Sequence, residues 1–284
     1  MKNDYWLVST EHMSDRLWFR DNEDYKTGMN YVGVGTTLFD LDILAFVLMS
    51  NHVHFVFAGK ESYAIDFLER FKAIYSQYVR RKYDLAGLLR RNALNIQKLH
   101  LGEESLERAL AYVQMNPVAA RICLHPTAYP WGTGDSFFRV NPPQGKQVGD
   151  ISIRQRIKLF HSRISLPSSY IIDPGGFINP HSYVPVRFVE SIYRTPSRMN
   201  YFLQNSSKAR LLKEAPSFND QLVSMAIKDL TVSLFRQAAF SELSPEHAAE
   251  VLRQVRYRFS ADPKQIARVS GLSYEKVIEL LDRI

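Results

Sequence analysis

The most informative run of residues is Ser50-Asn51-His52-Val53-His54-Phe55-Val56, which follows an apolar run at 43–49. Two apolar runs separated by a short polar pair predict two neighbouring strands with a tight turn at Ser50-Asn51. Side chains alternate along a strand, so His52 and His54 are expected on one face, with the intervening apolar side chains in the core. Two imidazoles side by side on a rigid strand favour a divalent metal site. A pair of ordinary hydrogen-bonded histidines has the same spacing.

Composition limits the class of protein. The chain has 284 residues with 45% hydrophobic residues, enough for one large domain or two to three small ones. Its net charge of +7 is compatible with a nucleic-acid partner without proving one. The single cysteine, Cys123, excludes an intramolecular disulfide framework and fits a reducing, cytoplasmic location. No apolar run approaches the length of a membrane span, so no membrane partner is expected.

Hydrophobic patterning predicts the order of elements in the first half of the chain. We expect strands at 5–9 and 95–100, the hairpin at 43–58, and helices at 21–31, 63–83 and 103–116. The last of these helices should end or kink at Asn116, because Pro117 disfavours a helical conformation there. This order indicates an α+β fold in which helices pack on one face of a small sheet.

Domain boundaries are predicted from proline and glycine spacing. A cluster of these residues follows position 126, so we expect a first domain at 1–135 and a linker at 136–150. The region 151–230 shows no recognisable chemistry. We expect a mostly α-helical C-terminal region with a last domain at 231–284.

The segment 262–281 has the pattern of a helix-turn-helix. Gly271 permits the tight turn and Ser273 can cap the second helix. That helix would present Tyr274, Lys276 and Arg283 to DNA, but it also carries acids, so contact with another protein stays an alternative.

An acid-poor stretch between residues 68 and 100 is the best candidate for binding a nucleic-acid backbone, since its only acids are Glu69 and Asp84. Basic residues late in a helix also complement its dipole, so solvent-exposed lysines and arginines are the plain alternative. The predicted phosphate contacts are Lys72, Arg80, Arg81, Lys82, Arg90, Arg91 and Lys98.

The helix expected at 103–116 offers a nucleophile and a third ligand. Tyr112 and Asn116 are four residues apart and so share one helix face. An amide oxygen is an acceptable ligand for Mg²⁺ or Mn²⁺. The chain has fifteen tyrosines, most of which must be structural, and Tyr75 and Tyr78 are rivals on a neighbouring helix.

Two motifs carry a resemblance to a known family. The run at 49–57, Met-Ser-Asn-His-Val-His-Phe-Val-Phe, resembles the metal-binding strand of the HUH single-tyrosine transposases, which usually have Pro where this chain has Ser50. The run at 111–120, Ala-Tyr-Val-Gln-Met-Asn-Pro-Val-Ala-Ala, resembles the tyrosine helix of the REP-associated tyrosine transposases, as does Tyr129-Pro130-Trp131 after it. The resemblance covers roughly residues 1–135. Family members often have aromatic and basic residues together before this helix, whereas here Arg90-Arg91 is followed by Asn92-Ala93.

The resemblance implies a ferredoxin-like HUH domain and a specific chemistry. His52, His54 and Asn116 would hold Mg²⁺ or Mn²⁺, and Tyr112 would attack the scissile phosphate, leaving a 5′-phosphotyrosine link and a free 3′-hydroxyl. The implied partner is single-stranded or hairpin DNA, and with one tyrosine per chain a two-cut reaction needs a homodimer or reuse of one site.

Three functions stay open at the level of sequence. The first is an active single-tyrosine strand transferase. The second is a catalytically inactive, transposase-derived DNA-binding protein that reads DNA with its helix-turn-helix. The third is a metal-dependent phosphodiesterase that uses activated water, which would tolerate Tyr112→Phe but not loss of either strand histidine.

Overall fold

The computed structural model describes residues 4–13, 16–84, 92–100, 104–208, 218–259 and 261–282. The first part consists of β1 (Tyr5–Thr10), α1 (Asn22–Gly35), β2 (Leu41–Met49), β3 (His52–Gly59), α2 (Glu61–Tyr83), β4 (Leu94–Leu99) and α3 (Ser105–Ala119). The middle part consists of β5 (Lys146–Gln147), α4 (Ile153–Phe160), β6 (Ile171–Ile172), α5 (Val186–Tyr193) and α6 (Pro196–Gln204). The last part consists of α7 (Asp220–Phe235), α8 (Pro245–Phe259), α9 (Pro263–Ser270) and α10 (Tyr274–Asp282).

The predicted α+β fold with an antiparallel sheet is confirmed. The main sheet has the strand order β2-β3-β1-β4, and each neighbouring pair is antiparallel. Strands β2 and β3 form the predicted hairpin, with Met49 paired to His52 across the turn. The turn therefore places the two histidines at the start of a central strand.

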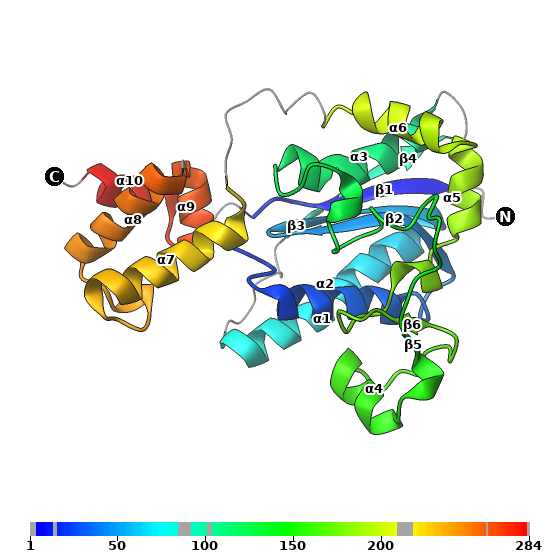
Figure 1. Cartoon of the computed structure of the whole chain (residues 1–284), viewed down its shortest axis with the longest axis horizontal. Helices are drawn as coiled ribbons and strands as arrows, with labels where there is room; N and C mark the ends of the chain where they lie inside the picture. The colour runs from blue at the N-terminus through cyan, green and yellow to red at the C-terminus, as the bar shows by residue number, and fades with distance from the viewer. Residues whose placement is uncertain are drawn as a thin grey trace.

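Helices cover both faces of this sheet, so the prediction that they pack on one face is wrong. On β3, His54 makes an edge contact with Tyr112 of α3, whereas Phe55 and Phe57 contact Phe67 of α2. Because side chains alternate along a strand, α3 and α2 must lie on opposite faces. Figure 1 shows α3 and α6 on one side of the sheet, and α1 and α2 on the other.

Helix α1 extends beyond the segment expected to be helical. It runs to Gly35, although its glycines made an earlier end plausible. A Cβ atom at Gly33 would lie 2.8 Å from the Cδ1 of Ile178. The missing side chain lets the middle part of the chain pack directly against the helix, and this contact outweighs the weak helix propensity of glycine.

Helix α3 also runs further than expected, through Pro117 to Ala119, so the predicted end at Asn116 is wrong. Proline has no N–H to donate to the carbonyl of Val113, one turn earlier. The Asn116 amide nitrogen donates to that carbonyl at 3.3 Å and to the carbonyl of Tyr112 at 2.9 Å. A side chain thus replaces the hydrogen bond that proline removes.

The main hydrophobic core crosses the predicted domain boundary at 135. Buried side chains from the middle part, including Val189, Tyr193 and Phe202, belong to the same cluster as the strands of the main sheet. Within the predicted linker, Phe137 is buried in this cluster and Val148 is buried against α1 in a smaller one. The segments after 135 thus help to enclose the sheet.

The C-terminal helices α7 to α10 form their own buried cluster at one end of the sheet (Figure 1). The predicted helix pair is present: α9 ends at Ser270, the next residue Gly271 has φ +76°, and the amide of Lys276 donates to the Ser273 hydroxyl at the start of α10. Val277, Ile266 and Ala267 belong to the same buried cluster. In the described parts of the chain, every helix is too short or too polar to form a membrane span.

One buried polar network ties these helices to the β2–β3 turn. The Ser50 hydroxyl donates to Asp220 at 2.6 Å, and Asp220 accepts two hydrogen bonds of 2.7 Å from the guanidinium of Arg268. The carboxyl of Asp220 is 8% exposed. Burial alone would raise its pKa, but the bonds and charge of Arg268 bring that pKa below its ordinary value.

We expect Asp220→Ala to destabilise the protein by about 3 kcal/mol, the lower end of the range for breaking a buried ion pair, since Arg268 is still 20% exposed. The loss arises because the guanidinium keeps its desolvation cost without a partner. Urea unfolding followed by circular dichroism would measure it. Asp229→Ala on the exposed face of α7 is the control, and equal stability of both variants would contradict the role given to Asp220.

Candidate metal and tyrosine site

Three histidines lie together at the start of β3. His12, His52 and His54 each offer a ring nitrogen, and these atoms lie within 4.8 Å of one another. The ring of His12 stacks on that of His52 at 3.6 Å, and the His52 and His54 rings meet edge to face at 4.8 Å. The pair expected from the sequence is therefore brought together, with His12 added to it.

A reciprocal pair of hydrogen bonds holds His12 in place. Just after β1, the amide of Met13 donates to the carbonyl of Asn51 at 3.2 Å. The side-chain amide of Asn51 donates back to the Met13 carbonyl at 2.8 Å. The segment after β1 is thus fixed against the β2–β3 turn, which brings the His12 ring over His52.

The side chain of Asn51 also fixes the orientation of His52. Because the nitrogen of its amide donates to Met13, its oxygen faces the Nδ1 of His52 at 2.8 Å, and Nδ1 is then the donor. The Nε2 atom of His52 is left with a free lone pair, and it is buried without a hydrogen-bond partner. A ligand histidine whose other nitrogen donates to an oxygen is the usual arrangement in metal sites.

Electrostatics keep the imidazoles neutral. Burial, with smaller contributions from Lys208 and His12, lowers the pKa of His54 to about 3. Burial, His54 and His12 also hold the pKa of His52 well below its ordinary value. Both nitrogens of His54 are buried without a partner. Buried polar atoms without partners are rare, and a cation bound by the three imidazoles would satisfy them.

Asn51→Leu should weaken divalent-metal binding by about 10–100-fold, the range for losing an outer partner of a metal ligand. The substitution keeps the side-chain size and removes both the acceptor for His52 and the donor to Met13. Titration calorimetry with Mn²⁺ would measure the affinity, with Asn141→Leu in an exposed loop as control. An unchanged affinity would show that Asn51 does not orient the ligand.

Tyr112 lies beside the three histidines. Its ring meets the His54 ring edge to face at 5.4 Å, and the Lys208 ammonium lies 4.9 Å from the centre of the phenol ring. Burial raises the pKa of Tyr112, so the phenol is protonated at neutral pH and must lose its proton to act as a nucleophile.

A cleft of about 550 Å³ opens next to this phenol between β1, β4 and α3. Its polar lining includes Ser9, Asn95 and Gln97. Ser9 pairs with His54 on one side and Asn95 on the other, so these three side chains project from the same face of the sheet. The cleft thus opens beside the phenol, next to the strand position paired with His54.

Asn116, predicted as the third ligand, follows Tyr112 by one turn on the same helix face and is 3% exposed. Its amide nitrogen is held by backbone carbonyls of α3, which fixes the side chain. The rivals of Tyr112 are structural: Tyr75 is fully buried, with its hydroxyl donating to the carbonyl of Trp18. The Tyr78 hydroxyl donates to Asp24.

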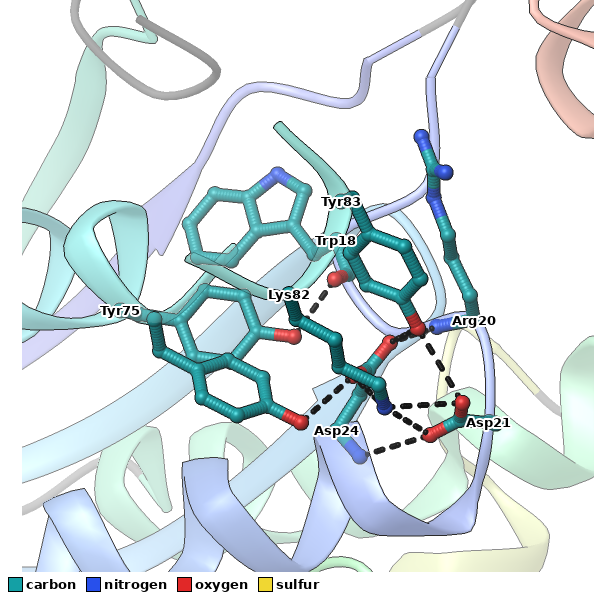
Figure 2. A network of polar contacts seen from close by, with 8 residues as sticks. Trp18, Arg20, Asp21, Asp24, Tyr75, Lys82 and Tyr83 are labelled. Atoms are coloured by element: carbon teal, nitrogen blue, oxygen red, sulfur yellow. Dashed lines mark hydrogen bonds and ion pairs between the residues drawn. The ribbon is translucent and has the colours of Figure 1, made fainter. Parts of the chain in front are cut away.

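Two of the predicted phosphate contacts are engaged by other groups of the protein. Lys72 is 5% exposed, and its ammonium donates to Glu69 and to the carbonyl of Asn92 at 2.7 Å each. Lys82 lies at the surface and donates to Asp21 and Asp24 in the polar network of Figure 2. Lys72 thus holds the interior together, whereas the role of Lys82 in binding DNA phosphates stays a prediction.

The remaining predicted contacts are spread over three surfaces. Arg80 and Arg81 are exposed at the end of α2, and Lys98 lies on β4 beside Asp4 at 3.0 Å. Tyr274 begins α10 and is 45% exposed, while Lys276 pairs with Glu279 of the same helix. The other three predicted contacts lie outside the described residues: Arg90, Arg91 and Arg283.

The roles of three site residues were not predicted from the sequence: His12, Asn51 and Lys208. A usable signal existed for His12, because a histidine just past the end of a strand that pairs with β3 can reach the first residue of β3. Asn51 was assigned only to the turn. Lys208 follows α6 and meets Tyr112 across a long sequence separation, which local patterns do not report.

Comparisons with known proteins show a distant likeness to a solved structure. No protein-family model matches the chain, and no curated protein matches it. Among solved structures, the chain is similar to the REP-associated tyrosine transposase bound to a REP hairpin, with 13% sequence identity and a TM-score of 0.34. The alignment covers 48% of this chain and 79% of that chain. This is a distant structural relationship, and it assigns no role to any residue.

Proposed function

We propose that this protein cleaves and rejoins single-stranded DNA, in a metal-dependent, transposase-like reaction through a 5′-phosphotyrosine intermediate. The observation that carries the proposal is the contact between the Tyr112 phenol and a buried histidine whose ring nitrogens have no partner. A candidate nucleophile and a set of nitrogen donors thus lie side by side, with ring centres 5.4 Å apart. The two motifs that resemble the HUH single-tyrosine transposases supply these residues, His52, His54 and Tyr112.

The arrangement of the sheet supports a ferredoxin-like HUH domain. The elements follow the order β-α-β-β-α-β from β1 to β4, with β1 and β3 in the centre of the sheet. Central strands are the most rigidly held, which suits a site whose ligands must keep their geometry.

We further propose that the metal is held by His12, His52 and His54, with the amide oxygen of Asn116 as a fourth donor. Three neutral imidazoles fit Mn²⁺ better than Mg²⁺, which prefers oxygen ligands. When bound, such a cation would neutralise charge on the scissile phosphate and polarise its phosphorus.

The chain's own residues account for the rest of the reaction. The Tyr112 oxygen forms a bond to phosphorus while the bond from phosphorus to the 3′-oxygen breaks. The phenol proton passes to water or a base, and the departing 3′-oxygen takes up a proton and becomes a hydroxyl. One phosphorus–oxygen ester bond replaces another, so the reverse attack by a 3′-hydroxyl rejoins DNA without ATP. Lys208 places positive charge beside the incoming phosphate.

The α9–α10 pair favours a second candidate, a DNA-binding protein without catalysis. The decisive experiment mixes the protein with labelled single-stranded hairpin DNA and Mn²⁺, and resolves the products on a denaturing gel. A covalent protein–DNA adduct supports strand transfer. Binding without cleavage would indicate the second candidate, and cleavage without an adduct would indicate a phosphodiesterase that uses water.

A further inference from the structure

A second cleft, of about 610 Å³, lies between the segment before α1 and the C-terminal helices. It is lined by Tyr83 at the end of α2, by Phe240, and by the turn between α9 and α10. It is separate from the cleft beside Tyr112, with which it shares no lining residue. Its basic side chains are Arg16, Arg20, Lys228, Arg268 and Lys276.

The charged side chains of this lining are all positive, since no acidic residue belongs to it among the described residues. Two of the cations are already paired, Arg268 with Asp220 and Lys276 with Glu279. Among the described residues, no carboxylate forms an ion pair with Arg20 or with the exposed Lys228 on α7. These two side chains keep their full charge for a ligand.

The Arg20 side chain is held in position without being neutralised. Its backbone amide donates to Asp24, while its guanidinium extends away from the polar network, as Figure 2 shows. The guanidinium lies 4.6 Å from the centre of the Tyr83 ring. The Tyr83 hydroxyl donates to Asp21 and Asp24, which fixes the ring. The fixed ring thus holds an unpaired guanidinium at the cleft, where it can meet a phosphate.

We propose that this cleft binds the backbone of a single DNA strand, with Arg20 and Lys228 on phosphates and the ring of Phe240 available for stacking. The proposal rests on the proposed function, because it specifies a route for the substrate strand. A cleft of this size admits one strand, whereas a duplex would lie across its mouth. It adjoins the catalytic region through Arg268, which is bonded to Asp220 and thereby to Ser50, two residues before His52.

The test measures fluorescence anisotropy of a labelled oligothymidine strand, in EDTA, so that neither metal nor cleavage contributes. The double variant Arg20→Gln/Lys228→Gln should bind about tenfold more weakly, with the slope of log K against log salt concentration shallower by about 1.4 for two lost phosphate contacts. Arg154→Gln, an exposed arginine on α4 outside the cleft, should bind as the wild type does. Arg20→Lys/Lys228→Arg keeps both charges and should restore the slope.

Wild-type affinity and slope in the double variant, with its fold verified by circular dichroism, would overturn the proposal. An equal loss of affinity for a blunt duplex would also overturn it, because the cleft would then not select a single strand. If the double variant loses strand binding while the wild-type protein forms no adduct with Mn²⁺, the cleft stands and the proposed catalysis fails. If the wild-type protein forms the adduct and the double variant binds the strand as the wild type does, the proposed catalysis stands and the proposed cleft fails.

Discussion

Tyr112→Phe is expected to abolish the covalent protein–DNA adduct, lowering its rate of formation by about 10³-fold or more, as loss of a nucleophile does in other covalent enzymes. Phenylalanine keeps the edge contact with His54 and the ring beneath Lys208, and lacks only the oxygen that would bond to phosphorus. The measurement is the amount of adduct on a denaturing gel with Mn²⁺ present.

Two controls make this result specific to the hydroxyl. Strand binding in EDTA should be unchanged in Tyr112→Phe, which separates loss of chemistry from loss of substrate. Tyr201→Phe, at an exposed position on α6, should form adduct at the wild-type rate. Persistence of the adduct in Tyr112→Phe would assign the nucleophile to another residue, and persistence of cleavage alone would favour attack by water.

Removal of a strand histidine should have the next largest effect. His52→Ala and His54→Ala are each expected to weaken Mn²⁺ binding by more than about 100-fold, since losing an outer partner of a ligand alone costs 10–100-fold. Each variant removes a buried ring nitrogen that has no other hydrogen-bond partner. Titration calorimetry measures the loss directly, and His100→Ala at the exposed end of β4 is the matched control.

The same titration tests the two further ligands one at a time. If His12 coordinates the metal, His12→Ala loses affinity comparably to the strand histidines. If Asn116 is the fourth donor, Asn116→Ala also loses affinity, and wild-type affinity in either variant removes that residue from the ligand set. Wild-type affinity in both His52→Ala and His54→Ala would rule out a metal site at this end of the sheet.

Local sequence patterns predicted the elements whose conformation depends mainly on residues close together in the sequence. The hairpin at 43–58 follows from alternation and a polar turn, and the α9–α10 pair follows from Gly271 and Ser273. The common face of His52 and His54 required nothing beyond the two-residue period of a strand.

The parts that were missed depend on contacts between distant segments. In the sequence, Lys72 has the pattern of a surface cation on α2. In the structure its ammonium is buried and donates to the carbonyl of Asn92, twenty positions away. The continuation of α3 past Pro117 depends on a side chain that donates to its own helix, which outweighs the usual effect of proline. His12 is placed by bonds between residues 13 and 51, which no local period reveals.

The serine at position 50 has a consequence for how freely the last four helices could be exchanged between proteins. Its hydroxyl donates the hydrogen bond that links the turn to Asp220, and a proline ring at this place has no such donor. A chimera that joins these helices to a turn with proline at this place would therefore lose this hydrogen bond beside the imidazoles. To keep this hydrogen bond, a chimera that carries the last four helices would also need serine at this position of the turn.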